Sequence, residues 1–99
     1  MTQIAVVGAG AWGTALADLL ARNGHTVTLW AYETDVAASI TASHENTRFL
    51  AGFTLAPALR ATSDIAAAVA GAEVVLYVAP SSVLRRVVRQ SAPHLASHA

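Results

Sequence analysis

The apolar residues of the chain follow two alternating patterns, short continuous stretches and longer stretches with helical spacing. Continuous stretches of four or five apolar residues, rich in β-branched side chains, are typical of strands buried on both faces of a parallel sheet. Residues 4–7 and 74–78 have this pattern, and residues 26–30 begin with three β-branched side chains. With a shorter candidate at residues 59–62, the pattern predicts four strands.

The segment after the first strand has the spacing of an amphipathic helix. Asp18 and Arg22 stand four residues apart on its polar side, in the order that favours an ion pair. Gly24 is the predicted end of this helix. The apolar face predicted to point inward consists of Trp12, Ala15, Leu16, Leu19 and Leu20.

Three further helices are predicted between and after the later strands, over residues 34–43, 64–70 and 81–92. Thr34 is the predicted cap of the first of them, and Gly71 ends the second. The inner face predicted for the last helix consists of Leu84, Val87, Val88 and Ser91.

Strands and helices therefore alternate along the chain, which predicts an α/β fold with a doubly wound, mostly parallel sheet of about four strands and helices on both faces. In such a sheet residues 74–78 lie beside residues 4–7. The far side of the 74–78 strand is then an open apolar edge, which further strands normally cover. We therefore expect residues 1–99 to be a partial Rossmann-like domain of a longer chain, inactive and marginally stable by itself.

Composition limits the classes of function. The net charge is zero, which argues against nucleic acid or an anionic membrane as a partner. The apolar residues 1–21 and 65–79 are interrupted by glycine or glutamate, so neither predicts a signal peptide or a membrane span, and a cytoplasmic protein is expected. His94 and His98 lack an acidic partner, so no metal site is predicted. Arg85, Arg86 and Arg89 are interpreted as a solvated helix face.

The residues between the first strand and the first helix read Gly8-Ala9-Gly10-Ala11-Trp12-Gly13. A GxGxxG motif is weak evidence alone, but here it follows a buried strand and opens a helix within a βαβ unit. Gly8 permits a tight turn, Gly10 lets the backbone approach a phosphate, and Gly13 lets the helix pack on the strand. The turn therefore predicts binding of a pyrophosphate of NAD or NADP at the start of the helix.

Other candidate site residues follow the second and fourth strands. Glu33 comes twenty residues after Gly13, where a carboxylate that binds the ribose hydroxyls is expected, and Tyr32 is an alternative contact that stacks on adenine. No arginine stands beside Glu33, which favours NAD over NADP. Trp12 has two interpretations, a core residue or a side chain that lines the cofactor cleft. Ser81 likewise either contacts the cofactor or caps the last helix.

Residues 4–17, IAVVGAGAWGTALA, closely resemble the start of the bacterial NAD(P)-dependent glycerol-3-phosphate dehydrogenases. The resemblance continues through residues 21–25, 27–30, 45–50 and 62–64, and through Val78-Ala79-Pro80-Ser81. It implies an oxidoreductase that uses NADH or NADPH to reduce dihydroxyacetone phosphate to sn-glycerol 3-phosphate, which feeds phospholipid synthesis.

The resemblance also implies roles for single residues. Trp12 and Phe49 match positions that line the cofactor site of the family, and Pro80 and Ser81 belong to a matching motif. Ala11 stands where many members have serine, and Tyr32 stands where many have arginine or histidine near the adenosine phosphate. These two departures remove one polar contact and put a preference for NADP in doubt.

The family's catalytic lysine and helical substrate domain follow this segment, which contains no lysine, so no catalytic residue is assigned here. The implied partners are a dinucleotide and, for the full-length protein, a small phosphorylated substrate; a homodimer is allowed. Two alternatives stay open. One is another dehydrogenase with the same N-terminal domain, acting on a 3-hydroxyacid or a nucleotide sugar. The other is a nucleotide-binding module without enzymatic activity.

Overall fold

The computed structural model describes residues 2–78 and 81–94, with the backbone alone for residues 81–84. Four parallel strands form one sheet with the spatial order β3-β2-β1-β4. The strands are β1 (Gln3–Val7), β2 (Thr26–Trp30), β3 (Arg60–Thr62) and β4 (Val74–Tyr77). The doubly wound α/β fold and the pairing of β4 with β1 are therefore as the sequence predicts.

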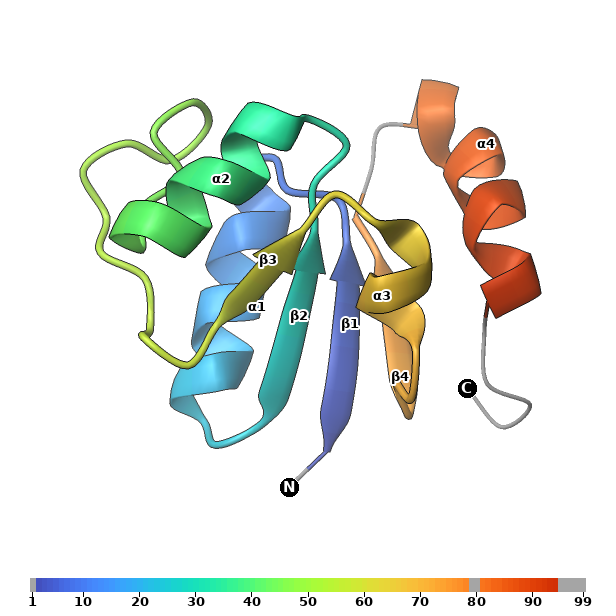
Figure 1. The fold of residues 1–99 in the computed structure, drawn as a ribbon, viewed down its shortest axis with the longest axis horizontal. Helices are drawn as coiled ribbons and strands as arrows, with labels where there is room; N and C mark the ends of the chain where they lie inside the picture. Colours follow the sequence, from blue (N-terminus) through green and yellow to red (C-terminus); the bar gives the residue numbers. More distant parts are fainter. Residues whose placement is uncertain (1, 79–80, 95–99) are drawn as a thin grey trace.

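Helices cover both faces of this sheet (Figure 1). They are α1 (Ala11–Arg22), α2 (Thr34–Ser43), α3 (Ile65–Val69) and α4 (Ser81–Ser91), followed by the 3₁₀ turn η1 (Ala92–His94). The side chains of Ile4 and Val6 pack in one buried cluster with α1 and α2, whereas Ala5 and Val7 pack in a second cluster with α3 and α4. Alternate residues of β1 thus point to opposite layers, which explains why its apolar stretch is unbroken.

The ends of the helices are set by local chemistry. Gly24, at φ 92°, follows α1, and Gly71, at φ 73°, follows α3; both take the left-handed conformation that glycine allows. The Asp64 side chain caps α3 by accepting from the Ala66 and Ala67 amides. The cap predicted for α2 is one residue off, because Glu33 occupies the N-cap position and Thr34 begins the helix.

The face that α1 presents to the sheet differs from the predicted one. Trp12 is 83% exposed and Leu19 is 56% exposed, and Ala15 also faces solvent. The residues that α1 buries are instead Gly13, Thr14 and Ala17. Of the predicted face, Leu16 is half-buried and Leu20 packs against the buried cluster, as expected. The small side chains let the helix lie close to the sheet, which leaves Trp12 and Leu19 outside the contact. The interpretation of Trp12 as a core residue is therefore wrong.

Asp18 lies at the centre of the contacts that hold the loop after α2. It forms the predicted pair with Arg22, at 2.9 Å between Arg22 Nε and Asp18 Oδ2. Its Oδ1 atom also accepts from the buried Ala56 amide at 2.7 Å, and Arg22 donates to the Thr54 carbonyl. The pair therefore fastens the irregular segment before β3 to the outer side of α1.

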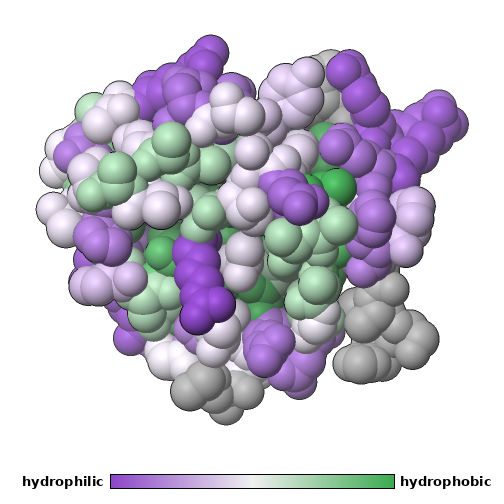
Figure 2. All heavy atoms as spheres, in the orientation of Figure 1, coloured by the Kyte–Doolittle hydropathy of each residue, from purple (hydrophilic) through white to green (hydrophobic). Residues whose placement is uncertain are grey.

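Hydrophilic residues gather over α4 at the right of Figure 2, whereas apolar side chains show over α2 and α3. Of the inner face predicted for α4, Val87 and Ser91 are buried, Val88 is 38% exposed, and the Leu84 side chain lies outside the described residues. Ser91 shares a hydrogen bond with the Tyr77 hydroxyl, which ties the end of α4 to the end of β4.

Candidate functional site

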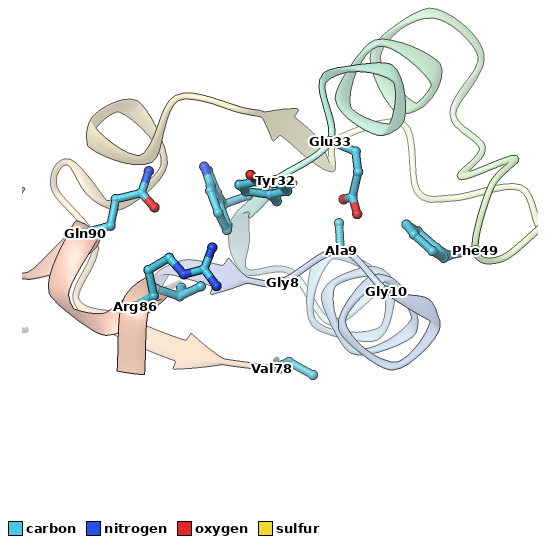
Figure 3. Close-up of a pocket in the computed structure, with 11 residues that line it drawn as sticks. Gly8, Ala9, Gly10, Tyr32, Glu33, Phe49, Val78, Arg86 and Gln90 are labelled. Carbon is cyan, nitrogen blue, oxygen red and sulfur yellow. The ribbon is translucent and has the colours of Figure 1, made fainter. Parts of the chain in front are cut away.

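A cleft of about 390 Å³ opens at the carboxyl ends of β1 and β2. Its walls come from the turn before α1, from the segment between β2 and α2, and from α4 (Figure 3). In open parallel sheets, ligands bind at this end, where neighbouring strands lead to helices on opposite faces. The lining residues are Gly8, Ala9, Gly10, Trp30, Tyr32, Glu33, Phe49, Val78, Arg86, Val87 and Gln90.

The turn between β1 and α1 depends on glycine at two places. Gly8 has φ 127°, a conformation that only glycine adopts readily, and its amide donates to the Trp30 carbonyl at 3.0 Å. At Gly13 an added Cβ would stand 1.7 Å from the Gly8 carbonyl oxygen. Gly13 thus allows the first turn of α1 to rest directly on the backbone at the end of β1.

Gly10 is different, because nothing within this structure requires it to be glycine. Its φ of −71° and ψ of −172° suit any residue, and a Cβ placed on it would meet no atom within 4 Å. Because Gly10 itself lines the cleft, that Cβ would stand in open space. The space in front of Gly10 is therefore open to a ligand.

The N-terminus of α1 is left without local compensation. Gly10 is its N-cap residue and supplies no side-chain hydrogen bond, and the first turn holds no acidic residue. The first amides of a helix have no partner inside the helix and carry a partial positive charge. Since this helix start borders the cleft, it is suited to an anion such as a phosphate.

Tyr32 and Glu33 lie at the end of β2. The Tyr32 ring is 69% exposed and meets Trp30 edge to face, with the ring centres 6.2 Å apart. The Glu33 side chain is half-buried, makes no capping hydrogen bond to α2, and is drawn pointing toward the Ala9–Gly10 segment in Figure 3. The structure thus brings both residues into the cleft with the glycine turn, as the spacing in the sequence predicts.

Phe49 reaches the cleft from the loop after α2, where an antiparallel bridge joins Asn46 to Leu50. The Asn46 side chain is fully buried and accepts from the Phe49 amide at 3.1 Å. Arg48 lies over the Phe49 ring at 5.2 Å and also pairs with Asp35. Phe49 is therefore held both through its backbone and over one face of its ring.

The wall contributed by α4 is the part of the site that sequence reasoning missed. Arg86 and Gln90 stand one helical turn apart on either side of the buried Val87, and all three line the cleft. Arg86 is exposed and forms no ion pair with any other residue of the described ranges, 2–78 and 81–94. Arg85, Arg86 and Arg89 are all exposed, as the sequence predicts, but Arg86 also lines the cleft, and nothing in the sequence distinguishes it from the other two.

The remaining predicted site residues do not line the cleft, or cannot be placed. Ala11 and Trp12 are exposed at the start of α1 and stand beside the lining residues without joining them. Pro80 lies outside the described residues, and only the backbone of Ser81, the first residue of α4, is described.

In the described ranges, 2–78 and 81–94, no three His, Asp or Glu side chains gather as metal ligands would. His98 lies outside those ranges. No helix among the same residues has both the length and the apolar character needed to cross a bilayer.

The comparisons with known proteins agree with this geometry. The family described as "NAD-dependent glycerol-3-phosphate dehydrogenase N-terminus" matches residues 3–99. A glycerol-3-phosphate dehydrogenase [NAD(P)+] of Syntrophotalea carbinolica is 55% identical over 94 residues, which are 95% of this chain and 28% of that protein. The chain therefore spans less than a third of the length of this curated relative.

Two solved structures have the same fold over nearly the whole chain. The glycerol-3-phosphate dehydrogenase of Coxiella burnetii superposes with a TM-score of 0.91 at 37% identity, over 98% of this chain and 30% of that one. A PanE/ApbA family ketopantoate reductase from Ralstonia eutropha superposes with a TM-score of 0.82 at 32% identity, over 98% and 32%. The fold is thus shared with a ketopantoate reductase family, whereas the family whose sequence pattern matches residues 3–99 is that of the glycerol-3-phosphate dehydrogenases. This chain belongs to the NAD-dependent glycerol-3-phosphate dehydrogenase family, of which it represents the N-terminal part.

Proposed function

We propose that this chain binds the pyrophosphate of NAD or NADP at the start of α1, as the cofactor-binding part of a glycerol-3-phosphate dehydrogenase. The observation that carries the proposal is the bare turn from Gly8 to Gly10, which lines the cleft at a helix start without a cap. Unpaired amides and the positive end of the helix dipole attract a diphosphate there.

The other walls of the cleft suit the adenosine half of the same ligand. The Glu33 carboxylate is placed to accept hydrogen bonds from the ribose hydroxyls. Tyr32 and Arg86 come from opposite walls and present flat surfaces on which a purine base stacks. The pyrophosphate and the adenosine would thus lie in one continuous cleft between α1, α2 and α4.

For the whole protein we propose reduction of dihydroxyacetone phosphate to sn-glycerol 3-phosphate. The nicotinamide supplies the hydride, and the protein must orient it and provide an acid for the carbonyl oxygen. We assign no proton transfer to the residues described here, because the lysine that the family resemblance implies has no counterpart in a segment without lysine. The contribution of this segment is to bind the nucleotide and fix its direction.

The intact protein is expected to oxidise NADH or NADPH only when dihydroxyacetone phosphate is present. The test follows absorbance at the nicotinamide band, with ketopantoate as the competing substrate because a ketopantoate reductase shares the fold. Turnover with ketopantoate and none above blank with dihydroxyacetone phosphate would indicate a ketopantoate reductase instead. Nucleotide binding without turnover on a wider carbonyl panel would favour the non-enzymatic module.

We expect the intact protein to bind NADH at least tenfold more tightly than NADPH. The 2′-phosphate of NADPH adds nearly two negative charges at the ribose, where the Glu33 carboxylate repels them. Glu33→Gln is expected to narrow the ratio of the two Kd values by about three- to tenfold, measured by titration calorimetry. Glu73→Gln, which neutralises a carboxylate beside Gln3 at the other end of β1, is the matched control and should leave the ratio unchanged. An unaltered ratio in Glu33→Gln would count against this role of Glu33.

We further propose that the protein forms a homodimer and that it is cytoplasmic, as its sequence leads us to expect. Size-exclusion chromatography with light scattering tests the oligomeric state, and cell fractionation tests the location. A monomer in solution would refute the first and leave the assignment of the cleft unchanged.

A further inference from the structure

One buried polar side chain, Asn46, contacts the glycine turn from behind. Its Nδ2 atom donates to the Ala9 carbonyl at 2.9 Å and to the Thr14 hydroxyl at 2.8 Å, and its Oδ1 atom accepts from the Phe49 amide at 3.1 Å. Both N–H groups and the oxygen of this amide are therefore used, as a fully buried amide requires. Asn46 joins the turn, the first helix and the Phe49 loop at a single point.

The Ala9 carbonyl is the centre of this network, because the Thr14 hydroxyl donates to it as well, at 3.3 Å. In a planar trans peptide the carbonyl and the following N–H point in opposite directions, and the chain contains no cis peptide among the described residues. Two donors that hold the Ala9 carbonyl inward therefore turn the Gly10 N–H outward. Gly10 is exposed and lines the cleft, and its amide donates to no backbone carbonyl among the described residues.

We propose that Asn46 is a positioning residue for the nucleotide: it holds the Ala9–Gly10 peptide so that the Gly10 N–H points into the cleft and donates to a phosphate oxygen. These hydrogen bonds are needed to fix the Ala9–Gly10 peptide, because Gly10 permits the orientation with its N–H turned away from the cleft at little cost. The same side chain holds the Phe49 amide, so the aromatic wall and the phosphate turn keep their relative position. This inference rests on the proposed binding of a dinucleotide and adds a residue that does not touch the ligand.

A positioning role of Asn46 can be distinguished from a purely structural one, because the Gly10 amide that it orients is proposed to contact only the phosphates of the ligand. ADP-ribose carries the pyrophosphate and adenosine does not, while both carry the base and the ribose. If Asn46 orients the Gly10 amide, its loss weakens ADP-ribose and spares adenosine. If Asn46 only stabilises the fold, both ligands lose affinity together.

The test uses the intact protein with Asn46→Asp, which keeps an acceptor for the Phe49 amide and loses both donated hydrogen bonds. The Kd for ADP-ribose is expected to rise about tenfold and the Kd for adenosine to change less than twofold. Asn23→Asp makes the same chemical change at the exposed end of α1 and should alter neither value. With ¹⁵N-glycine labelling, the Gly10 amide signal should move on addition of ADP-ribose in the wild type and in Asn23→Asp, but not in Asn46→Asp.

A second pair of variants keeps the inference testable if Asn46→Asp does not fold. Thr14→Val removes the hydroxyl that supports both Asn46 and the Ala9 carbonyl, whereas Thr14→Ser retains it. We expect about threefold weaker ADP-ribose binding in the valine variant and wild-type binding in the serine variant. Equal ADP-ribose affinities in this pair, or equal losses of adenosine and ADP-ribose in Asn46→Asp, overturn the positioning role. A wild type that does not bind ADP-ribose would instead refute the proposed function.

Discussion

The Gly13→Ala variant of the intact protein is expected not to reach the native fold in useful yield. A Cβ at this position would stand 1.7 Å from the Gly8 carbonyl oxygen and 2.9 Å from the Gly8 carbonyl carbon. Neither atom is able to move aside, because both belong to the backbone of a turn that is held to β2. Relief requires α1 to lift from the sheet, which we expect to cost more than about 4 kcal/mol. Soluble yield and the midpoint of thermal unfolding by circular dichroism measure this.

Gly10→Ala is the matched control, since it makes the same substitution three residues earlier in the same turn. A Cβ there meets no atom within 4 Å, and the backbone of Gly10 is in an ordinary extended conformation. Its unfolding midpoint should lie within about 3 °C of the wild type. A Gly13→Ala protein that unfolds at the wild-type temperature would show that α1 does not pack as described.

The Gly10→Val variant is expected to fold normally and to lose most of its affinity for NADH. Its branched side chain would occupy the open space in front of the helix start, where the proposal places the pyrophosphate. Keeping the phosphates from the first amides of α1 should cost about 2–3 kcal/mol, or roughly 30- to 150-fold in Kd. Titration calorimetry with the intact protein measures the change, and circular dichroism confirms that the variant is folded.

Ala15→Val serves as the control for the added bulk, because Ala15 faces solvent on the next turn of α1. Its Kd for NADH should stay within twofold of the wild type, and Gly10→Ala should fall between the two valine variants. A folded Gly10→Val protein with the wild-type Kd would place the dinucleotide elsewhere. The two glycines therefore separate by experiment into one that the fold needs and one that the ligand needs.

Much of the cofactor turn could be predicted from the sequence because its signals are local. An unbroken apolar strand, three glycines at fixed offsets and a helical stripe all lie within residues 4–20 and need no knowledge of distant contacts. Glu33 could be predicted by its distance along a βαβ unit, since the length of that unit determines where β2 ends. The structure places Glu33 in the same cleft as Gly8 and Gly10.

The contributions from distant segments were not predictable in the same way. Asn46 stands in a loop whose composition resembles many surface loops, yet its side chain is buried against Ala9 and Thr14, more than thirty residues away in sequence. Arg86 is one of three arginines on α4, and periodicity does not indicate which of them faces a neighbouring element. Both residues acquire their roles from the packing of segments that the sequence does not place together.

The sequence by itself determined the α/β class, the parallel pairing of β4 with β1, and the glycine turn at the start of α1. These follow from short-range spacing, which repeats with the period of each element. Only the tertiary structure decided that Trp12 and Leu19 face solvent while Thr14 and Ala17 are buried. Helical spacing identifies an apolar stripe, but how closely a helix docks depends on the smallest side chains at its contact.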